Sequence, residues 1–367
     1  MTPSGAEEDG SIPELPKTLR GLHAVEPAEA ETASRVTDQT PNNLPLELSS
    51  FVGREKELAE VMQLLGEDRL VTLTGSGGGG KTRLALAAAR ELVEGFEDGV
   101  WLVELASLAD SSLVSGAVTS TLGVREQPGR SPTEILSGYL GAKKLLLVLD
   151  NCEHLIDACA ELAEALLRSC PELRILATSR EALGVAGEIA WPVPPLSLPD
   201  LRRLPDFESL PRYESARLFV ERTARVKPDF ALTEQNASAV AQVCYRLDGI
   251  PLAIELAAAR AKVLSVEEIS EKLDDCFRLL TAGSRTAMPR HRTLHATMDW
   301  SHDLLPGQER LLFRRLSMFV GGFSLEAAEF VCAGWDLERD DVLDLLSHLV
   351  DKSLVVAREL AGEARYR

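Results

Sequence analysis

The feature that most constrains the fold of this chain is a glycine-rich turn between an apolar run and an amphipathic stretch. Residues 70–89 read LVTLTGSGGGGKTRLALAAA, so Gly75 and Gly80 bracket four residues and are followed by Lys81 and Thr82. This GxxxxGKT spacing between a strand and a helix is the pattern of a P-loop. The small residues let backbone N–H groups turn inward around a phosphate, and the start of the following helix adds its positive dipole end. The sequence therefore predicts a phosphate-binding loop on an α/β scaffold.

The residues of this motif define a candidate nucleotide site. Lys81 is expected to reach the β- and γ-phosphates, and the Thr82 hydroxyl is expected to ligate Mg²⁺. The residues expected to contact the nucleotide through the loop are Gly75, Ser76, Gly77, Gly78, Gly79, Gly80, Lys81, Thr82 and Arg83. A glycine-rich turn without function is the plain alternative, and the strand, spacing, lysine and threonine together disfavour it.

A dinucleotide-binding turn is a rival interpretation of the same letters. Gly75, Gly77 and Gly80 also satisfy GxGxxG, and Glu104 ends the next expected strand, where a ribose-binding acid would lie. A lone GxGxxG is a weak signal, and the lysine and threonine of the loop have no role in such a turn. This interpretation is therefore disfavoured.

An acidic partner for the metal follows a later apolar run. The segment KKLLLVLD ends in Asp150, which is expected to end a strand beside the phosphate strand and to be the outer-sphere Mg²⁺ ligand. The hydrolytic base is less well defined, because Asn151 follows where many ATPases have a second acid, and an amide cannot take a proton from water. Glu153 is the nearest carboxylate, and a helix start explains it equally well. We therefore expect slow or gated hydrolysis.

An arginine follows the next expected strand. After LRILATS at 173–179 comes Arg180, whose guanidinium would lie near a γ-phosphate and distinguish a triphosphate from a diphosphate through charge-assisted hydrogen bonds. A solvated arginine at a strand terminus is the alternative. The candidate catalytic residues are thus Asp150, Glu153 and Arg180, and the candidate metal ligands are Thr82 and Asp150.

Alternation of apolar runs with helical stretches defines the fold class. Strands are expected at 70–74, 100–105, 144–150, 173–179 and within 188–200. Intervening residues with apolar spacings of three and four predict helices on the faces of a mostly parallel sheet. The expected P-loop α/β domain covers 46–200, and helices alone follow over 201–280. Short helices and two strand-like pieces over 281–367 predict a winged-helix unit.

Composition excludes several other classes. The 367 residues are 45% hydrophobic and 26% charged, so a chain dominated by disorder is excluded, although the acidic, proline-containing residues 1–45 are predicted to be a disordered leader. The net charge of −18 disfavours non-specific binding to nucleic acid. The six cysteines never form CxxC, which predicts buried, reduced thiols. No apolar run of membrane-spanning length and no signal peptide are found, so we expect a cytoplasmic protein without membrane contact.

Two further segments complete a family pattern. Together with FVGREKEL at 51–58 and DGIPLAIELAAAR at 248–260, these motifs resemble the STAND class of signal-transduction ATPases, the NB-ARC-like group, and within it the bacterial transcriptional-regulator branch. The resemblance covers about residues 45–367 in motif order and ends with HRTLHATMDWSHDLL at 291–305.

The resemblance implies how an adenine nucleotide, ATP or ADP, is bound. It implies that Val52, Gly53, Arg54 and Pro251 flank the adenine, and that the helical and winged-helix units close over the nucleotide as a lid. Gly249 permits a close backbone approach, and Pro251 offers a ring on which a base could rest. A helix start with proline in its first turn is an equally good local explanation of Pro251.

Departures from the family pattern limit these implications. Gly79 stands where the family usually has a β-branched or larger residue, and Asn151 replaces a second acid, although this branch often has that asparagine. The family usually places a nucleotide-contacting MHD-like segment after the winged-helix strands. This chain ends at Arg367 before such a segment, so we expect a truncated winged-helix unit and the switch portion of a longer regulator.

The expected function is an ATP/ADP-dependent signal-transduction switch with slow hydrolysis. Its expected partners are adenine nucleotide and either a second copy or a regulatory protein, with DNA bound only through a domain absent from this chain. One alternative is a non-hydrolysing nucleotide-binding scaffold. Another is a regulator that binds DNA through its own winged helix, but DVLDLLSHLVDKS carries Asp341, Asp344 and Asp351 against only Lys352, the wrong charge for a major groove.

Overall fold

The structure is a computed structural model of the whole chain. It describes residues 40–125, 127–202, 206–273, 280, 294–334, 336–360 and 362–367. The expected leader up to residue 39 and the first residues of the HRTLHATMDWSHDLL motif lie outside the described residues. The chain from Thr40 to Arg367 forms one unit by its contacts.

Five parallel strands form the sheet of the first half of the chain. They are β1 (Leu70–Thr74), β2 (Val100–Glu104), β3 (Leu146–Asp150), β4 (Arg174–Thr178) and β5 (Glu188–Pro192). Their order in the sheet is β2-β3-β4-β1-β5, and every neighbouring pair is parallel. Every residue of β1 and β3 is buried, as expected where helices cover both faces of a parallel sheet. The expected α/β class with a parallel sheet is confirmed.

The strand order corrects one expectation about Asp150. Its strand β3 does not lie beside the phosphate strand β1, because β4 lies between them. The inner strands are all largely apolar and buried, so the hydrophobic pattern gives strand positions along the chain but not neighbours in the sheet. The order also disagrees with the dinucleotide interpretation. There the acid ends a strand adjacent to the first, whereas Glu104 ends the edge strand β2, which is separated from β1 by the two strands β3 and β4.

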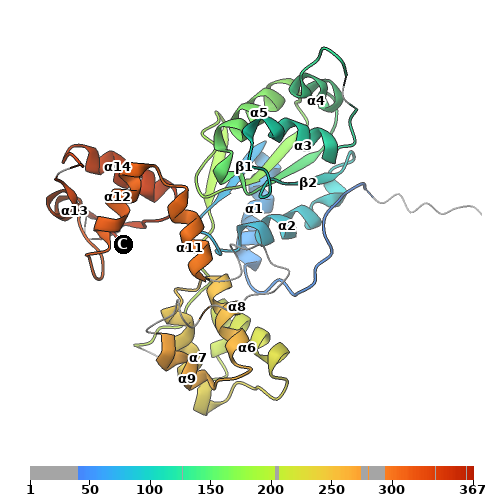
Figure 1. Cartoon of the computed structure of the whole chain (residues 1–367). Coiled ribbons are helices and arrows are strands. Elements are labelled where there is room, and N and C mark those ends of the chain that lie inside the picture. The colour runs from blue at the N-terminus through green and yellow to red at the C-terminus, as the bar shows by residue number, and fades with distance from the viewer. Residues whose placement is uncertain are drawn as a thin grey trace, which may run out of the picture. The chain divides into compact units, whose positions relative to one another are not determined.

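Helices cover both faces of the sheet (Figure 1). One layer consists of α1 (Glu55–Glu67) and α2 (Lys81–Glu91), and the other of α3 (Val114–Thr121), α4 (Pro132–Leu140) and α5 (Ile156–Ser169). Successive side chains of a strand point to opposite faces, so in β3 Val148 packs in the α1–α2 layer while Leu147 and Leu149 pack in the other. Short 3₁₀ turns lie at Val93–Gly95, Ser111–Leu113, Cys152–His154 and Leu210–Arg212.

An extended segment before α1, residues 40–50, adds to the edge of this sheet. The backbone N–H of Val100 donates to the carbonyl of Pro41 at 3.1 Å. The Asn43 amide exchanges two hydrogen bonds with the backbone of Leu102, at 2.8 and 2.6 Å. Contacts with the sheet therefore begin a few residues before the expected start of the α/β domain.

The rest of the described chain is mostly helical. The middle part contains α6 (Glu214–Val226), α7 (Glu234–Arg246), α8 (Pro251–Arg260) and α9 (Val266–Lys272) around a core that includes Phe219 and Ile254. Then follow α11 (Leu294–Asp303), α12 (Gly307–Leu316), α13 (Leu325–Cys332), α14 (Asp341–Asp351), β6 (Ala357–Leu360) and β7 (Glu363–Tyr366). The two strand-like pieces pair as an antiparallel hairpin.

The cysteines agree with the expectation of buried thiols. Cys152, Cys159, Cys170, Cys244 and Cys332 are buried and free. Cys276 lies outside the described residues. Among the described helices, none has the length and apolar character needed to cross a membrane.

A glycine before α8 fixes how this helix meets the chain that leaves the sheet. Gly249 has φ +70°, its carbonyl accepts from the N–H of Leu196 at 3.0 Å, and a Cβ placed on it would lie 2.3 Å from the Leu196 carbonyl oxygen. The close backbone approach expected at this glycine is therefore an approach to Leu196.

Gly249→Ala should lower the free energy of unfolding by about 2 kcal/mol or more, because backbone at such a distance cannot yield cheaply. The matched control is Gly187→Ala. Gly187 has a similar φ of +82° but nothing within 4 Å of its added Cβ, so only the backbone strain of about 1–2 kcal/mol applies. Urea unfolding of both variants measures the difference, and equal losses would contradict the packing argument.

Candidate functional site

The glycine-rich loop joins the end of β1 to the start of α2. Gly80 precedes α2 in the left-handed region at φ +89°, and Gly78 also has a positive φ of +78°. A Cβ on Gly78 would lie 2.9 Å from the Leu252 side chain, and one on Gly80 would lie 3.0 Å from the Arg54 guanidinium. Glycine is therefore required at both positions by backbone conformation and by space.

The lysine of the loop is held by the loop itself. The Lys81 ammonium donates to the carbonyl of Gly75 at 2.6 Å and to that of Ser76 at 3.1 Å. The side chain is nearly buried, so the ammonium is kept at the mouth of the loop and not in bulk solvent. This arrangement places a cation where the loop and the start of α2 meet.

A buried carboxylate joins three elements of the site. Asp150 Oδ1 accepts from the Thr82 hydroxyl of α2 at 2.6 Å and from the Thr178 hydroxyl of β4 at 2.7 Å. The Thr178 oxygen accepts in turn from the Asn151 N–H at 2.9 Å. Burial raises the pKa of Asp150, and the two hydroxyl groups oppose this shift. The two candidate metal ligands, Thr82 and Asp150, are thus in contact, although β4 lies between β3 and β1, the strand that leads into the loop and α2.

Arg180 forms a buried ion pair. Its Nε lies 3.4 Å from Oε1 of Glu153, and the two side chains are only 5% and 7% exposed. Arg180 is therefore buried and is not the solvent-exposed strand-end arginine of the alternative interpretation. Glu153 lies in a 3₁₀ turn whose orientation is fixed by His154, since the Asn151 amide donates to His154 Nδ1 at 3.2 Å and His154 Nε2 contacts the Leu108 carbonyl at 2.9 Å. Sequence reasoning missed the contribution of His154.

Arg54, at the start of α1, also contacts the phosphate-binding loop. It is buried, has φ +64° at the start of α1, and its Nη2 donates to the carbonyls of Gly79 at 2.6 Å and Pro194 at 2.9 Å. The backbone N–H of Arg54 donates to Glu214 of α6, whose other oxygen accepts from the Ser197 N–H at 3.0 Å. Arg54 therefore connects the phosphate-binding loop with the chain after β5 and, through its backbone, with α6.

These elements enclose a cleft of about 320 Å³, within the usual range of small-molecule sites. The expected site residues that line it are Val52, Arg54, Gly77, Gly78, Gly80, Lys81, Thr82, Arg83, Asp150, Glu153, Arg180 and Pro251. Those that do not line it are Gly53, Gly75, Ser76 and Gly79. The carbonyls of Gly75 and Ser76 accept from Lys81, and that of Gly79 accepts from Arg54. The lining residues that are not among the expected site residues are Phe51, Glu104, Asn151, Thr178, Leu196, Leu218, Leu252 and Glu255.

The cleft has the chemistry of a nucleotide–metal site. Cationic groups converge near the loop, which suits phosphate, while Thr82 and Asp150 offer adjacent oxygen atoms of the kind that Mg²⁺ prefers. The walls away from the loop are apolar, at Val52, Leu218 and Pro251, and suit a planar base. The residues present therefore fit a nucleotide with Mg²⁺.

The strand order, the loop and the cleft together define a P-loop ATPase fold. A solved structure, the Walker-type ATPase of Pyrococcus abyssi, superposes with a TM-score of 0.54 over 86% of this chain and 93% of that chain, at 14% identity. An uncharacterized protein of Mycobacterium tuberculosis is 47% identical over 321 residues, which are 87% of this chain and 78% of that protein. The chain belongs to the same family as this mycobacterial protein.

A second relative is much longer. A protein of Mycobacterium tuberculosis with the provisional name HTH-type transcriptional regulator is 52% identical over 306 residues, 83% of this chain and 33% of that protein. The chain thus spans about a third of the length of this relative. No protein-family model matches the chain.

Asp150 should cost stability at neutral pH. Because its folded-state pKa is raised, the ionised carboxylate destabilises the folded state, and stability improves as the pH falls toward that pKa. Asp150→Asn should therefore raise the melting temperature near pH 7, by about 2–4 °C for each kcal/mol gained, and the advantage should be smaller at a lower pH such as pH 5.

Asp98→Asn is a control of opposite sign. The hydrogen bond from Lys143, 2.8 Å long, lowers the pKa of Asp98, so its ionised form stabilises the folded state above the pKa of the unfolded chain. This variant should melt slightly lower near pH 7. Melting curves at both pH values test the pair, and a destabilised Asp150→Asn would contradict the burial argument.

Proposed function

We propose that this chain is an ATP/ADP-dependent switch of the STAND, NB-ARC-like class, and that it binds adenine nucleotide with Mg²⁺ in the cleft. The observation that carries the proposal is that one cleft is lined from two sides. The loop and Asp150 come from the sheet, whereas Leu218 and Pro251 come from α6 and α8. A ligand held in this way has different contacts when the helical part moves, which is the requirement for a two-state switch.

Each group at the loop has a proposed role. Lys81 binds the β- and γ-phosphates, and Thr82 and Asp150 hold Mg²⁺, which neutralises charge on those phosphates when bound. Val52 and Pro251 flank the adenine, and Arg180 contacts the γ-phosphate.

Slow hydrolysis follows from the state of the candidate bases. Asn151 cannot accept a proton from water, and the carboxylate of Glu153 faces the buried guanidinium of Arg180. A carboxylate in such a pair is a weak base until the pair separates. We therefore infer that hydrolysis is gated by movement of Arg180 away from Glu153.

The proposed organisation is a P-loop domain over 46–200, a helical lid over 201–280 and a winged-helix unit over 281–367. The longer relative named as an HTH-type regulator supports a role in transcription regulation. Asp341, Asp344 and Asp351 are exposed on or at the end of α14, so this helix suits packing against protein better than entry into a DNA groove. We propose that DNA binding belongs to a domain outside this chain.

Lys81→Ala should weaken binding of both ATP and ADP at least tenfold, since a charge-assisted contact to phosphate is worth about 1.5–3 kcal/mol. Titration calorimetry with Mg²⁺ present measures this change. Lys143→Ala, which removes a lysine paired with Asp98 away from the cleft, serves as the control and should bind normally. Equal affinity in wild type and Lys81→Ala would refute the P-loop assignment.

Arg180→Ala should weaken ATP by about tenfold to a hundredfold while leaving ADP nearly unchanged, because only ATP offers a γ-phosphate. The single variant leaves Glu153 buried without its partner, so the Arg180→Ala/Glu153→Ala double variant should be measured beside it. Displacement of a fluorescent nucleotide by ATP and by ADP gives the preference. An unchanged ATP-to-ADP ratio in both variants would show that the γ-phosphate is sensed elsewhere.

A further inference from the structure

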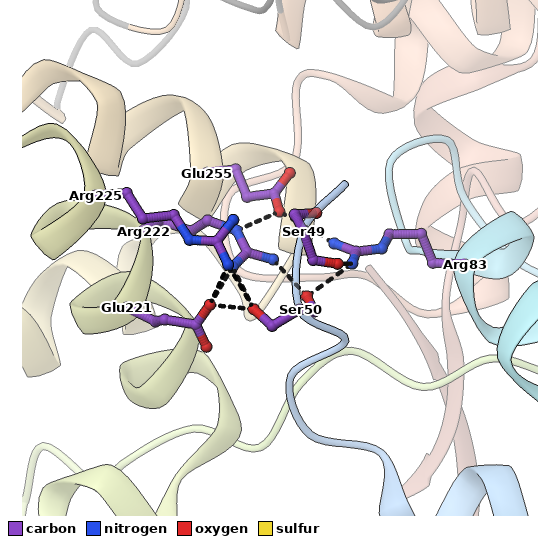
Figure 2. Close-up of polar contacts among 7 residues, drawn as sticks. All are labelled: Ser49, Ser50, Arg83, Glu221, Arg222, Arg225 and Glu255. Atoms are coloured by element: carbon purple, nitrogen blue, oxygen red, sulfur yellow. Dashed lines mark hydrogen bonds and ion pairs between the residues drawn. The ribbon is translucent and has the colours of Figure 1, made fainter. Parts of the chain in front are cut away.

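A polar cluster joins the extended segment before α1 to three helices (Figure 2). Its members are Ser49 and Ser50 of the segment, Arg83 of α2, Glu221, Arg222 and Arg225 of α6, and Glu255 of α8. We call these residues the Ser50 cluster. None of the motifs discussed above explains why these side chains should meet.

Two guanidinium groups from different helices converge on one carbonyl. Arg83 Nη2 donates to the Ser50 carbonyl at 2.7 Å and to the Ser49 carbonyl at 2.9 Å. Arg222 Nη2 donates to the same Ser50 carbonyl at 2.9 Å. The Ser50 hydroxyl also contacts Arg222 Nη1 at 3.1 Å and Arg225 Nη2 at 3.0 Å. The backbone at Ser50 is thereby fastened to α2 and α6 at once.

Two carboxylates supply the balancing charge. Glu221 accepts from Arg222 Nη1 at 2.7 Å and from Arg225 Nη2 at 3.0 Å. The second carboxylate is Glu255. It accepts from Arg222 Nε at 2.9 Å and lies 3.5 Å from Arg83 Nη1, so one carboxylate faces both guanidinium groups. Arg222 has only 10% of its side chain exposed, and a cation at that depth requires such partners. Burial lowers the pKa of Arg83, and the charge of Glu255 opposes this shift.

The cluster is continuous with the walls of the cleft. Arg83 follows Thr82 directly in the first turn of α2, and Ser50 is followed directly by Phe51 and Val52, which line the cleft. Glu255 lies one helical turn after Pro251 on α8, and both line the cleft. Arg222 itself does not line the cleft, yet it bonds to the segment before α1 and to α8, which both contribute lining residues.

We propose that Arg222 is a positioning residue for the nucleotide: through Ser50 and Glu255 it holds the Phe51–Arg54 wall and α8 against the P-loop helix, and so sets how slowly bound nucleotide leaves. This inference rests on the proposed nucleotide binding. Arginine is required because a planar fork reaches the Ser50 carbonyl, the Ser50 hydroxyl and Glu255 together, whereas lysine offers one point charge.

The test uses the full chain loaded with Mg²⁺ and N-methylanthraniloyl-ADP, and follows release of the fluorescent nucleotide after addition of excess ADP. Arg222→Gln should accelerate release about fivefold or more, the range of a coupling between distinct sites. The dissociation rate reports only molecules that hold nucleotide, so partial misfolding does not change it. Arg222→Lys keeps the charge and most of the volume, and it should also accelerate release. It provides the test if Arg222→Gln does not fold.

Arg217→Gln is the matched control. Arg217 lies on the same helix α6 and pairs with Glu55 at 2.6 Å, but the two side chains are 42% and 73% exposed, and such surface pairs contribute little. Its release rate should stay within about twofold of wild type. Glu255→Gln should accelerate release, and the Arg222→Gln/Glu255→Gln double variant should add little, because both changes break the same contact.

The outcomes separate this inference from the proposed function. One outcome would overturn the positioning role alone. In it, labelled ADP binds wild type, fails to bind Lys81→Ala, and leaves both Arg222 variants at the wild-type rate. The positioning role would also be overturned if Arg217→Gln accelerated nucleotide release as much as Arg222→Gln does. It would likewise be overturned if the accelerations by Arg222→Gln and Glu255→Gln multiplied fully in the double variant. Failure of wild type to bind would remove the proposed function and this inference together.

Discussion

The site depends on one buried carboxylate. Asp150 accepts from hydroxyl groups of α2 and β4 while ending β3, so a single oxygen fixes the P-loop helix relative to two strands. An ionised carboxylate at this depth is costly, and its raised pKa expresses that cost. The two hydroxyl groups offset part of the cost without neutralising the charge. The ionised carboxylate thus lowers the stability of the folded state, but it keeps an anionic oxygen next to the Thr82 hydroxyl, where a divalent cation can be held.

The second constraint is the contact between the loop and the helical part of the chain. Leu252 and Arg54 lie so close to the loop that a Cβ at Gly78 would be 2.9 Å from the Leu252 side chain, and a Cβ at Gly80 would be 3.0 Å from the Arg54 guanidinium. Farther along the cleft, the Ser50 cluster ties α2 to α6 and α8 through one stretch of backbone (Figure 2). The loop, the Phe51–Arg54 wall and the helical part are therefore linked by hydrogen bonds as well as by the cleft they share. A change in the loop can reach α6 and α8 through these bonds.

Sequence reasoning found the parts of the site that are encoded locally. The loop, the strand ends at Asp150 and Arg180, and the five strands follow from spacing and apolar runs, and the structure contains them. It placed β3 beside β1 wrongly, because buried strands with similar composition carry no signal for their neighbours. The contacts of Ser50 with Arg222 join residues 172 positions apart, and neither residue belongs to a motif. Such long-range polar contacts depend on tertiary packing, which periodicity cannot describe.

Whether the cleft holds an adenine nucleotide is tested most directly by the amount of nucleotide that the protein retains. The protein is incubated with Mg²⁺ and ATP, separated from free nucleotide by gel filtration, and denatured, and the released nucleotide is quantified by anion-exchange chromatography. The glycine-rich loop, the Lys81 ammonium and the apolar wall of the cleft together predict a near-equimolar amount of ATP or ADP per chain. Only a trace of nucleotide in a folded preparation would contradict nucleotide binding in the cleft.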